Sequence, residues 1–278
     1  MAKKEIITTA DDSILAELAA SAPQEAGFAR LMLPRLTFKS QDVMEGKGKA
    51  KKVVVEAGTF FTEVPTDVKD TDGKPVWDKT EIGLEFEGFI VYTRKQLRYY
   101  DEPNETFYST PIFDDNDAVL PLFAGGKKVA TGTPAELKKS FEYTTEEGKT
   151  RSKLEDNTVL YVLYENELYQ MSLRGSSMYS FKDFARKVPT AYNVHLIHFS
   201  SETQEKGSIE WNQMKFTAVR LVTGDEAVEI KEAIDKIKEA VEMEREFYAQ
   251  SAIDATVEAA VVSALPESEA SALPGGKF

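Results

Sequence analysis

Hydrophobic and polar residues alternate along much of the central chain, a pattern typical of β-strands that bury one face. Residues 82–100 alternate in part and favour one long strand. Residues 159–175 are apolar on both sides of residues 165–167, which predicts a hairpin, and a second hairpin is expected over residues 191–222. Residues 31–224 are therefore predicted to be β-rich.

Two other segments show the spacing of helices that bury one face. Residues 225–250 carry apolar side chains three, four or seven positions apart, and Asp225 and Glu226 begin the segment, where the helix dipole favours negative charge. The apolar stripe consists of Ala227, Ile230, Ile234, Ile237, Val241 and Tyr248. We expect this helix to pack on the β-rich body. A dimeric coiled coil is the alternative, which is disfavoured because the pattern is not a sustained heptad. A shorter helix is expected over residues 176–188.

Local composition predicts three regions. Residues 1–30 are Ala-rich and polar and are expected to form a flexible N-terminal arm. Residues 31–250 are expected to form one elaborated domain that includes the C-terminal helix, and residues 251–278 a flexible tail. Within the domain, residues 101–137 are rich in turn formers and are expected to make a long excursion. The predicted fold class is β-rich α+β.

The amino-acid composition excludes several kinds of chemistry. The 278 residues include no Cys, which excludes disulfides, iron–sulfur clusters and Cys-based zinc sites. The two His, His195 and His198, are three apart and face opposite sides of a regular strand, so they cannot share a metal. No P-loop, dinucleotide-binding loop, calcium loop or catalytic constellation is present. We expect no catalytic residues, no metal site and no cofactor, and therefore no enzyme.

The net charge of −13 argues at first against a nucleic-acid partner, because phosphates repel an acidic protein. The charge is uneven, however. Eight of the excess negative charges fall in residues 225–278 and two in residues 1–24, which leaves −3 for residues 25–224. The central chain is thus close to neutral, and net charge does not decide the question.

One basic segment stands out. Residues 35–52 carry a net charge of +4, and their lysines surround Gly46 and Gly48, which is typical of a mobile loop that can reach phosphates. The alternative interpretation is an ordinary solvated loop. The basic residues of the segment are Arg35, Lys39, Lys47, Lys49, Lys51 and Lys52.

Aromatic and basic residues are interleaved in two places. Such interleaving is typical of single-stranded nucleic-acid binding, in which rings stack on bases and cations follow the backbone. The alternative is that many of the rings face the core of a sheet. The first cluster is Tyr92, Arg94, Lys95, Arg98, Tyr99, Tyr100, Phe107 and Tyr108, and the second is Tyr179, Phe181, Lys182, Phe184, Arg186 and Lys187.

The order of several short motifs resembles a group of phage proteins taken to be single-stranded DNA-binding or replication-associated. These motifs are Leu33-Pro34-Arg35-Leu36, Tyr99-Tyr100, the hairpin Leu160–Met171 running into Leu173-Arg174-Gly175-Ser176-Ser177, Glu210-Trp211, Phe216 and Thr223-Gly224-Asp225-Glu226. The resemblance covers roughly residues 31–250. It implies an OB-like barrel, here with long insertions and a packed C-terminal helix, and OB-folds bind oligonucleotides on one barrel face.

The sequence therefore predicts a non-catalytic single-stranded DNA-binding protein of phage or mobile-element replication or recombination. Replication or recombination proteins are possible partners through the C-terminal tail, no membrane partner is expected, and an oligomer is compatible with the pattern. No apolar run suits a signal peptide or a bilayer span, so we expect a cytoplasmic protein, in a bacterial host cell if a phage encodes it. The predicted nucleic-acid-binding residues are Arg35, Lys39, Lys47, Lys49, Lys51, Lys52, Tyr92, Arg94, Lys95, Arg98, Tyr99, Tyr100 and Tyr108.

Two other functions fit the same sequence. One is a phage structural or assembly protein that self-associates through exposed strand edges and the acidic helix without binding DNA. The other is an acidic decoy that binds a basic host protein.

Overall fold

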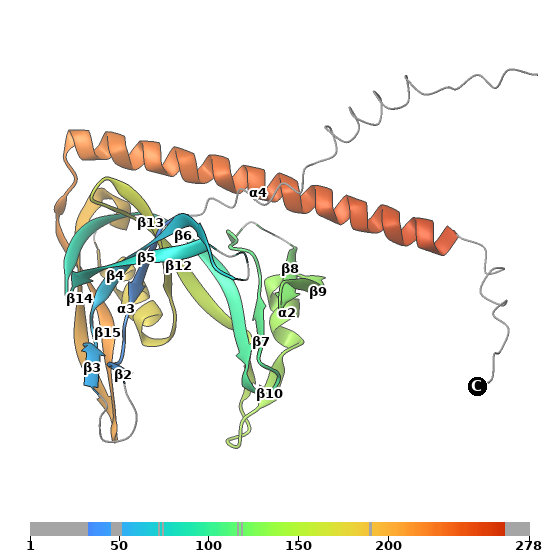
Figure 1. The fold of residues 1–278 in the computed structure, drawn as a ribbon, viewed down its shortest axis with the longest axis horizontal. Helices are drawn as coiled ribbons and strands as arrows, with labels where there is room; N and C mark the ends of the chain where they lie inside the picture. The colour runs from blue at the N-terminus through green and yellow to red at the C-terminus, as the bar shows by residue number, and fades with distance from the viewer. Residues whose placement is uncertain are drawn as a thin grey trace, which may run out of the picture. The chain divides into compact units, whose positions relative to one another are not determined.

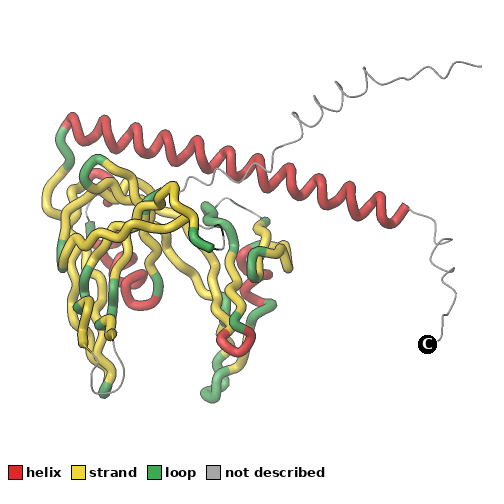
Figure 2. The backbone as a smooth tube through the Cα atoms, viewed as in Figure 1, coloured by secondary structure: helices red, strands yellow, loops and turns green. Residues whose placement is uncertain are grey.

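The computed structural model describes residues 33–45, 52–71, 73, 75–115, 117, 119–188 and 191–264. Strands dominate the compact body formed by Leu33–Glu239 (Figures 1 and 2). The strands are β1 (Arg35–Phe38), β2 (Val43–Glu45), β3 (Lys52–Val55), β4 (Phe60–Lys69), β5 (Pro75–Gly83), β6 (Phe86–Asp101), β7 (Thr106–Ser109), β8 (Leu120–Ala124), β9 (Lys127–Gly132), β10 (Glu142–Thr144), β11 (Thr150–Ser152), β12 (Glu155–Tyr164), β13 (Glu167–Leu173), β14 (His195–Lys206) and β15 (Ile209–Leu221). The helices are α2 (Pro134–Lys139), α3 (Gly175–Lys187) and α4 (Gly224–Ala264), with short 3-10 turns at η2 (Glu102–Asn104) and η3 (Tyr192–Val194).

Eleven of the described strands form one mixed sheet. Its order is β5-β4-β1-β13-β12-β6-β7-β8-β9, and β14 joins the start of β6 and pairs with β15. The pairing of β1 with β13 is parallel, and the other pairings are antiparallel. The β-rich prediction is confirmed. The sheet is not closed into a barrel, so the predicted OB-like barrel is not confirmed.

Both predicted hairpins are present. β12 and β13 pair from Thr158 opposite Leu173 to Tyr164 opposite Glu167. The two-residue turn between them, Glu165 and Asn166, has φ angles of 49° and 63°, as a tight turn between twisted strands requires. β14 and β15 form the second hairpin, which turns at Gly207 with a φ of 65°.

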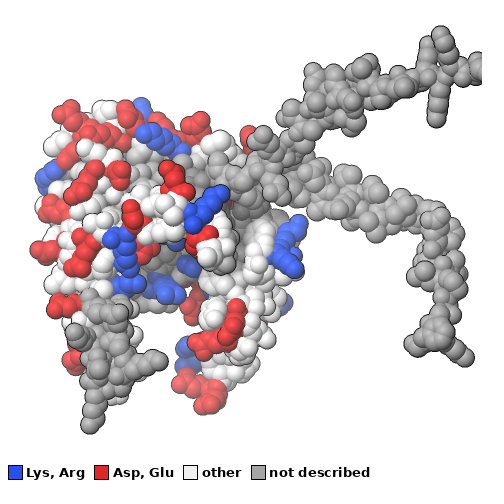
Figure 3. All heavy atoms as spheres, in the orientation of Figure 1, with Lys and Arg blue, Asp and Glu red and all other residues white. Residues whose placement is uncertain are grey.

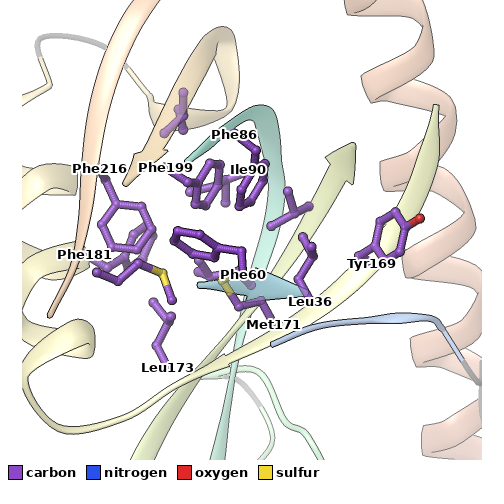
Figure 4. Packing of buried hydrophobic residues seen from close by; sticks show 14 of the residues in the cluster. Leu36, Phe60, Phe86, Ile90, Tyr169, Met171, Leu173, Phe181, Phe199 and Phe216 are labelled. Carbon is purple, nitrogen blue, oxygen red and sulfur yellow. The ribbon is translucent and has the colours of Figure 1, made fainter. Parts of the chain in front are cut away.

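The main core lies between the curved strands and α3. Rings of Phe60, Phe199, Phe216 and Phe181 point toward one another in Figure 4. Phe86 stacks on Phe199 with ring centroids 4.4 Å apart. The sequence places these rings at alternate strand positions or along one face of α3, which is why they converge on one interior. The predicted helix over residues 176–188 is confirmed as α3.

A second core lies beneath the other half of β6. It contains the buried side chains Leu97, Phe113, Leu120, Leu122, Leu137 and Leu154. The segment expected to be an excursion, residues 101–137, instead extends the sheet through β7, β8 and β9 and contributes α2. That expectation was wrong because the turn formers separate short strands rather than fill a structureless loop.

The C-terminal helix α4 starts at Gly224, one residue before the predicted start, and ends at Ala264, well beyond the predicted end at Gln250. Ile230, Ala233 and Ile237 are buried at helical spacing, as expected for a stripe that packs on the body. The predicted N-terminal arm, and the tail from residue 265 onward, lie outside the described residues. None of the described helices is long and apolar enough to cross a membrane.

Candidate nucleic-acid interface

The long strand β6 presents two different faces. Leu97 points into the second core, so Lys95 and Tyr99 lie on that side of the strand. Arg98 and Tyr100 alternate with them and lie on the opposite face. The predicted site residues of this strand are therefore divided between two surfaces.

Three arginines from separate segments lie on the face opposite the cores. Arg35 precedes buried Leu36 on β1, Arg98 follows buried Leu97 on β6, and Arg174 follows buried Leu173 at the end of β13. Burial and the positive charges of Arg174 and Arg35 lower the pKa of Arg98, so the charges of both other arginines act on the Arg98 guanidinium. We call Arg35, Arg98 and Arg174 the arginine cluster.

Carboxylates do not neutralise this cluster. Among the described residues, no Asp or Glu lies within 4 Å of the guanidinium nitrogens of Arg35, Arg98 or Arg174. Glu63, opposite Arg35 in β4, pairs instead with Lys79 at 3.4 Å. Arg98 is partly buried and Arg35 and Arg174 are exposed, and arginines without an ion-pair partner are suited to an anionic ligand.

Aromatic rings orient two of the three arginines. The Arg35 guanidinium carbon lies 4.0 Å from the centroid of the Trp77 ring on β5, and that of Arg98 lies 4.6 Å from the Phe107 ring on β7. Stacking on a ring fixes the plane of a guanidinium and leaves its N–H groups free to point along that plane. The cluster is therefore partly preorganised.

Exposed rings continue the same face beside Arg98. Tyr100 and Phe107 are directly opposite each other in the β6–β7 pair and are 52% and 39% exposed. In the space-filling view, several Lys and Arg side chains lie around a hollow near the middle of the picture, with Asp and Glu side chains beside them and over the rest of the visible surface (Figure 3). Tyr100, Phe107 and the arginine cluster together form what we call the arginine–aromatic face.

Several predicted binding residues lie elsewhere. The side chain of Arg94 is only 4% exposed, and its Nε lies 3.4 Å from the Asp114 carboxylate. Lys95 forms an ion pair with Asp115 on the other side of β6. These two cations already have protein partners.

The remaining predicted tyrosines are partly buried. Tyr99 and Tyr108 stack with centroids 5.8 Å apart, and both pack edge-on against Phe141 at the second core. Tyr92 lies 6.3 Å from the Tyr161 ring, on the same side of β6 as Arg98. Only Tyr92 and Tyr100, among the predicted tyrosines, share a side of β6 with the arginine cluster.

The basic segment is only partly described. Lys39 is partly buried directly after β1, and its backbone N–H donates to Thr59. Lys47, Lys49 and Lys51 lie outside the described residues. Lys52 is described as the first residue of β3, without its side chain.

Two contributors to the arginine–aromatic face are outside the basic segment and the aromatic clusters of the sequence. Trp77 stands in a mostly exposed strand, and Arg174 follows the second strand of a predicted hairpin. The only signal for Trp77 is a large ring at a position where the strand is otherwise polar. Arg174 appears only in the Leu173–Ser177 motif, with no feature that marks it as a phosphate ligand.

The described residues contain no group of three His, Cys, Asp or Glu side chains that could hold a metal ion. The chain matches no family model, no curated protein and no solved structure. The arginine–aromatic face is thus the feature on which a functional proposal can be built.

Proposed function

We propose that the protein binds single-stranded DNA without catalysis and acts in phage or mobile-element replication or recombination. The observation that carries the proposal is the arginine–aromatic face, where Arg98, without an ion-pair partner among the described residues, lies over the exposed Phe107 ring beside Tyr100, and the charges of Arg35 and Arg174 act on it. Arginine binds phosphate through paired N–H donors, and an exposed ring stacks on an unpaired base. This local arrangement is enough for an acidic protein to bind phosphates, because the part of the chain around it, residues 25–224, carries a net charge of only −3.

Single strands fit this face better than duplexes. The bases of a duplex are stacked on one another and cannot reach a ring on a sheet surface, whereas the bases of a single strand are free to stack. Binding across one face of a curved sheet is the way OB-folds bind oligonucleotides, and an OB-like mode of binding is part of this proposal.

Fluorescence anisotropy with labelled oligo-dT tests the proposal. We expect dissociation constants between nanomolar and micromolar at about 50 mM salt, and an affinity that falls steeply as salt rises because bound phosphates release counterions. Duplex DNA should bind more weakly. Absence of binding at micromolar protein would overturn the proposal. Large assemblies in light scattering, without affinity for DNA, would favour a phage structural or assembly protein.

Two substitutions of aromatic residues test whether DNA binds at the arginine–aromatic face. Tyr100→Ala and Phe107→Ala should each weaken binding by about fivefold or more, because stacking contributes roughly 1–3 kcal/mol per base. Tyr179→Ala is the matched control: Tyr179 is a 66% exposed tyrosine on α3, away from this face, and its loss should leave the affinity unchanged. Equal effects of all three substitutions would place the binding surface elsewhere.

A further inference from the structure

The second half of β15 is an open edge of the sheet. Among the described strands β15 pairs only with β14, and on its other side the backbone N–H groups of Asn212 and Met214 donate to a carbonyl after β1 and to Ser177 Oγ. Alternation along the strand points the N–H and C=O groups of Ala218 to that same side. Residues 217–221 are all exposed, and no hydrogen bond from another described segment reaches Ala218. This part of β15 can therefore pair with one more strand.

A groove runs between this edge and α3. Its volume is about 700 Å³, within the range of about 300–1,000 Å³ for ligand clefts. Phe184 and Val188 from α3 and Phe216 and Ala218 from β15 line it, and the centroids of the two phenylalanine rings lie 5.9 Å apart. A chain that pairs with the edge would lie in this groove, with backbone partners on one side and apolar side chains on the other. Strand addition to an exposed sheet edge is a common mode of peptide binding.

The charges at the groove are unequal. Both carboxylates that line it are paired with lysines that also line it, at 2.6 and 3.7 Å. Lys182 and Arg186 are exposed, one turn apart on α3, and have no ion-pair partner among the described residues. Lys182 Nζ lies 5.8 Å from the centroid of the Tyr179 ring, which lines the groove. Two unpaired positive charges beside the groove are complementary to carboxylates.

We propose that the groove between α3 and β15 binds an extended acidic peptide of a partner protein. The peptide backbone pairs with β15 at Ala218, its apolar side chains contact Phe184 and Val188, and its carboxylates meet Lys182 and Arg186. A peptide fits this edge better than a nucleic acid does, because a nucleic-acid backbone has no N–H donors for strand pairing. None of the residues of the arginine–aromatic face lines the groove, so this inference goes beyond the proposed function.

Fluorescence anisotropy on the full chain tests the proposal with a labelled peptide of about eight residues, an ordinary strand length, in which Val and Glu alternate. The salt concentration is about 150 mM, which screens the net negative charge of the chain. We expect saturable binding below about 1 mM peptide. The matching peptide with Lys in place of Glu should bind at least about tenfold more weakly, because like charges then meet at Lys182 and Arg186. Unlabelled oligo-dT should not displace the acidic peptide.

Substitutions locate the peptide on the protein. Lys182→Glu and Arg186→Glu are at exposed positions of α3 and should each weaken binding of the acidic peptide by about fivefold or more. Lys231→Glu, at an exposed position of α4 that does not line the groove, is the matched control and should leave the affinity unchanged. Ala218→Pro removes the N–H of the open edge, where a strand tolerates proline, and should abolish binding while circular dichroism melts show a folded protein.

The backbone pairing is also tested on the unsubstituted protein by N-methylating the acidic peptide. An extended peptide turns alternate N–H groups toward the edge. N-methylation of either the Val or the Glu residues should therefore abolish binding, whereas N-methylation of the other set should not.

Several results would overturn this inference. They are absence of binding to the acidic peptide, equal binding of the acidic and the lysine peptides, and equal affinities of the α3 variants and Lys231→Glu. Binding that survives Ala218→Pro and both N-methylations would exclude strand addition. Displacement of the peptide by oligo-dT would make DNA the occupant, and a dimer in light scattering that Ala218→Pro dissociates, without peptide binding, would make it a second copy of this chain. Loss of oligo-dT binding with peptide binding intact would overturn the proposed function alone.

Discussion

Arg94 and Arg98 show how differently one strand can use the same side chain. Both lie on the same side of β6, but Arg94 is buried against Asp114, whereas Arg98 lies over Phe107 and is repelled by two other arginines. The first arrangement stabilises the folded protein. The second arrangement combines a favourable cation–π contact with like-charge repulsion at a partly buried position.

The two residues should therefore respond in opposite ways to loss of charge. Arg94→Met removes an ionic partner of the mostly buried Asp114 and should lower the free energy of unfolding by about 2–3 kcal/mol. Arg98→Met retains an apolar stem over Phe107 and relieves repulsion, so the free energy of unfolding should stay unchanged or rise by up to about 1 kcal/mol. Urea denaturation of both variants measures the difference. A comparable loss in both would show that Arg98 has a structural role.

At the scale of elements, the junction between β15 and α4 is closed by a small polar cluster. The Glu226 carboxylate accepts two hydrogen bonds from the Arg220 guanidinium, at 2.7 and 2.8 Å, and one from the backbone N–H of Thr223 at 2.7 Å. These bonds lower the pKa of Glu226 from 4.5 to about 2. A carboxylate with a lowered pKa stabilises the fold above its unfolded-state pKa and loses that effect as the pH falls toward its folded-state value.

We expect Glu226→Gln to lower the free energy of unfolding by about 1 kcal/mol at neutral pH, in the range of helix caps and solvent-screened ion pairs. The difference from the unsubstituted protein should shrink between pH 5 and pH 2, because protonation then removes the same interaction. Denaturation experiments at several pH values measure this difference in the free energy of unfolding. Glu229→Gln, at an exposed position on the same helix, is the control and should show neither effect. A difference that stays constant with pH would contradict this account.

Local elements were predictable because their signals are local. The turn at Glu165 and Asn166 is flanked by apolar strands, and the stripe of α4 repeats at helical spacing, so each could be inferred from neighbouring residues alone. The end of α4 could not be inferred in this way, because the Ala-rich sequence after Gln250 suits a helix as well as a tail. The sheet extension through β7, β8 and β9 was missed for a related reason: its strands are short and separated by turn formers.

At the scale of the whole molecule, the candidate site depends on pairings between distant parts of the sequence. Arg35 and Arg174 come from neighbouring parts of the sheet because β1 pairs in parallel with β13, where Arg35 lies opposite Gln170, and Arg98 lies on β6, beyond β12. Alternation along one strand predicts which residues share a face, but it does not predict which strands become neighbours. Arg35, Arg98 and Tyr100 of the candidate site were therefore among the residues predicted from the sequence, whereas Arg174 and Phe107 were not.

The turn before β4 comes close to the β14–β15 hairpin. Gly58, in the turn before β4, has a φ of 93°, and a Cβ there would lie 2.5 Å from Ser201 Oγ on β14 and 3.7 Å from Asn212 on β15. The backbone N–H of Asn212 also donates to the Ser40 carbonyl, just after β1, at 2.8 Å. The sheet is not closed at this point, but the β14–β15 hairpin lies against the turn that connects to β4.

Gly58→Ala should therefore lower the free energy of unfolding by about 2–4 kcal/mol, since it combines an unfavourable backbone conformation with a steric clash across this approach. Gly207→Ala is the matched control: its φ of 65° is also positive, but no heavy atom lies within 4 Å of the added Cβ, so only the backbone cost of about 1 kcal/mol is expected. The second variant Ser201→Ala removes the nearest atom, so combining it with Gly58→Ala should recover part of the loss in a double-mutant cycle. Equal losses for the two glycine substitutions, with no coupling to Ser201, would mean that the turn before β4 is not held this closely to the β14–β15 hairpin in solution.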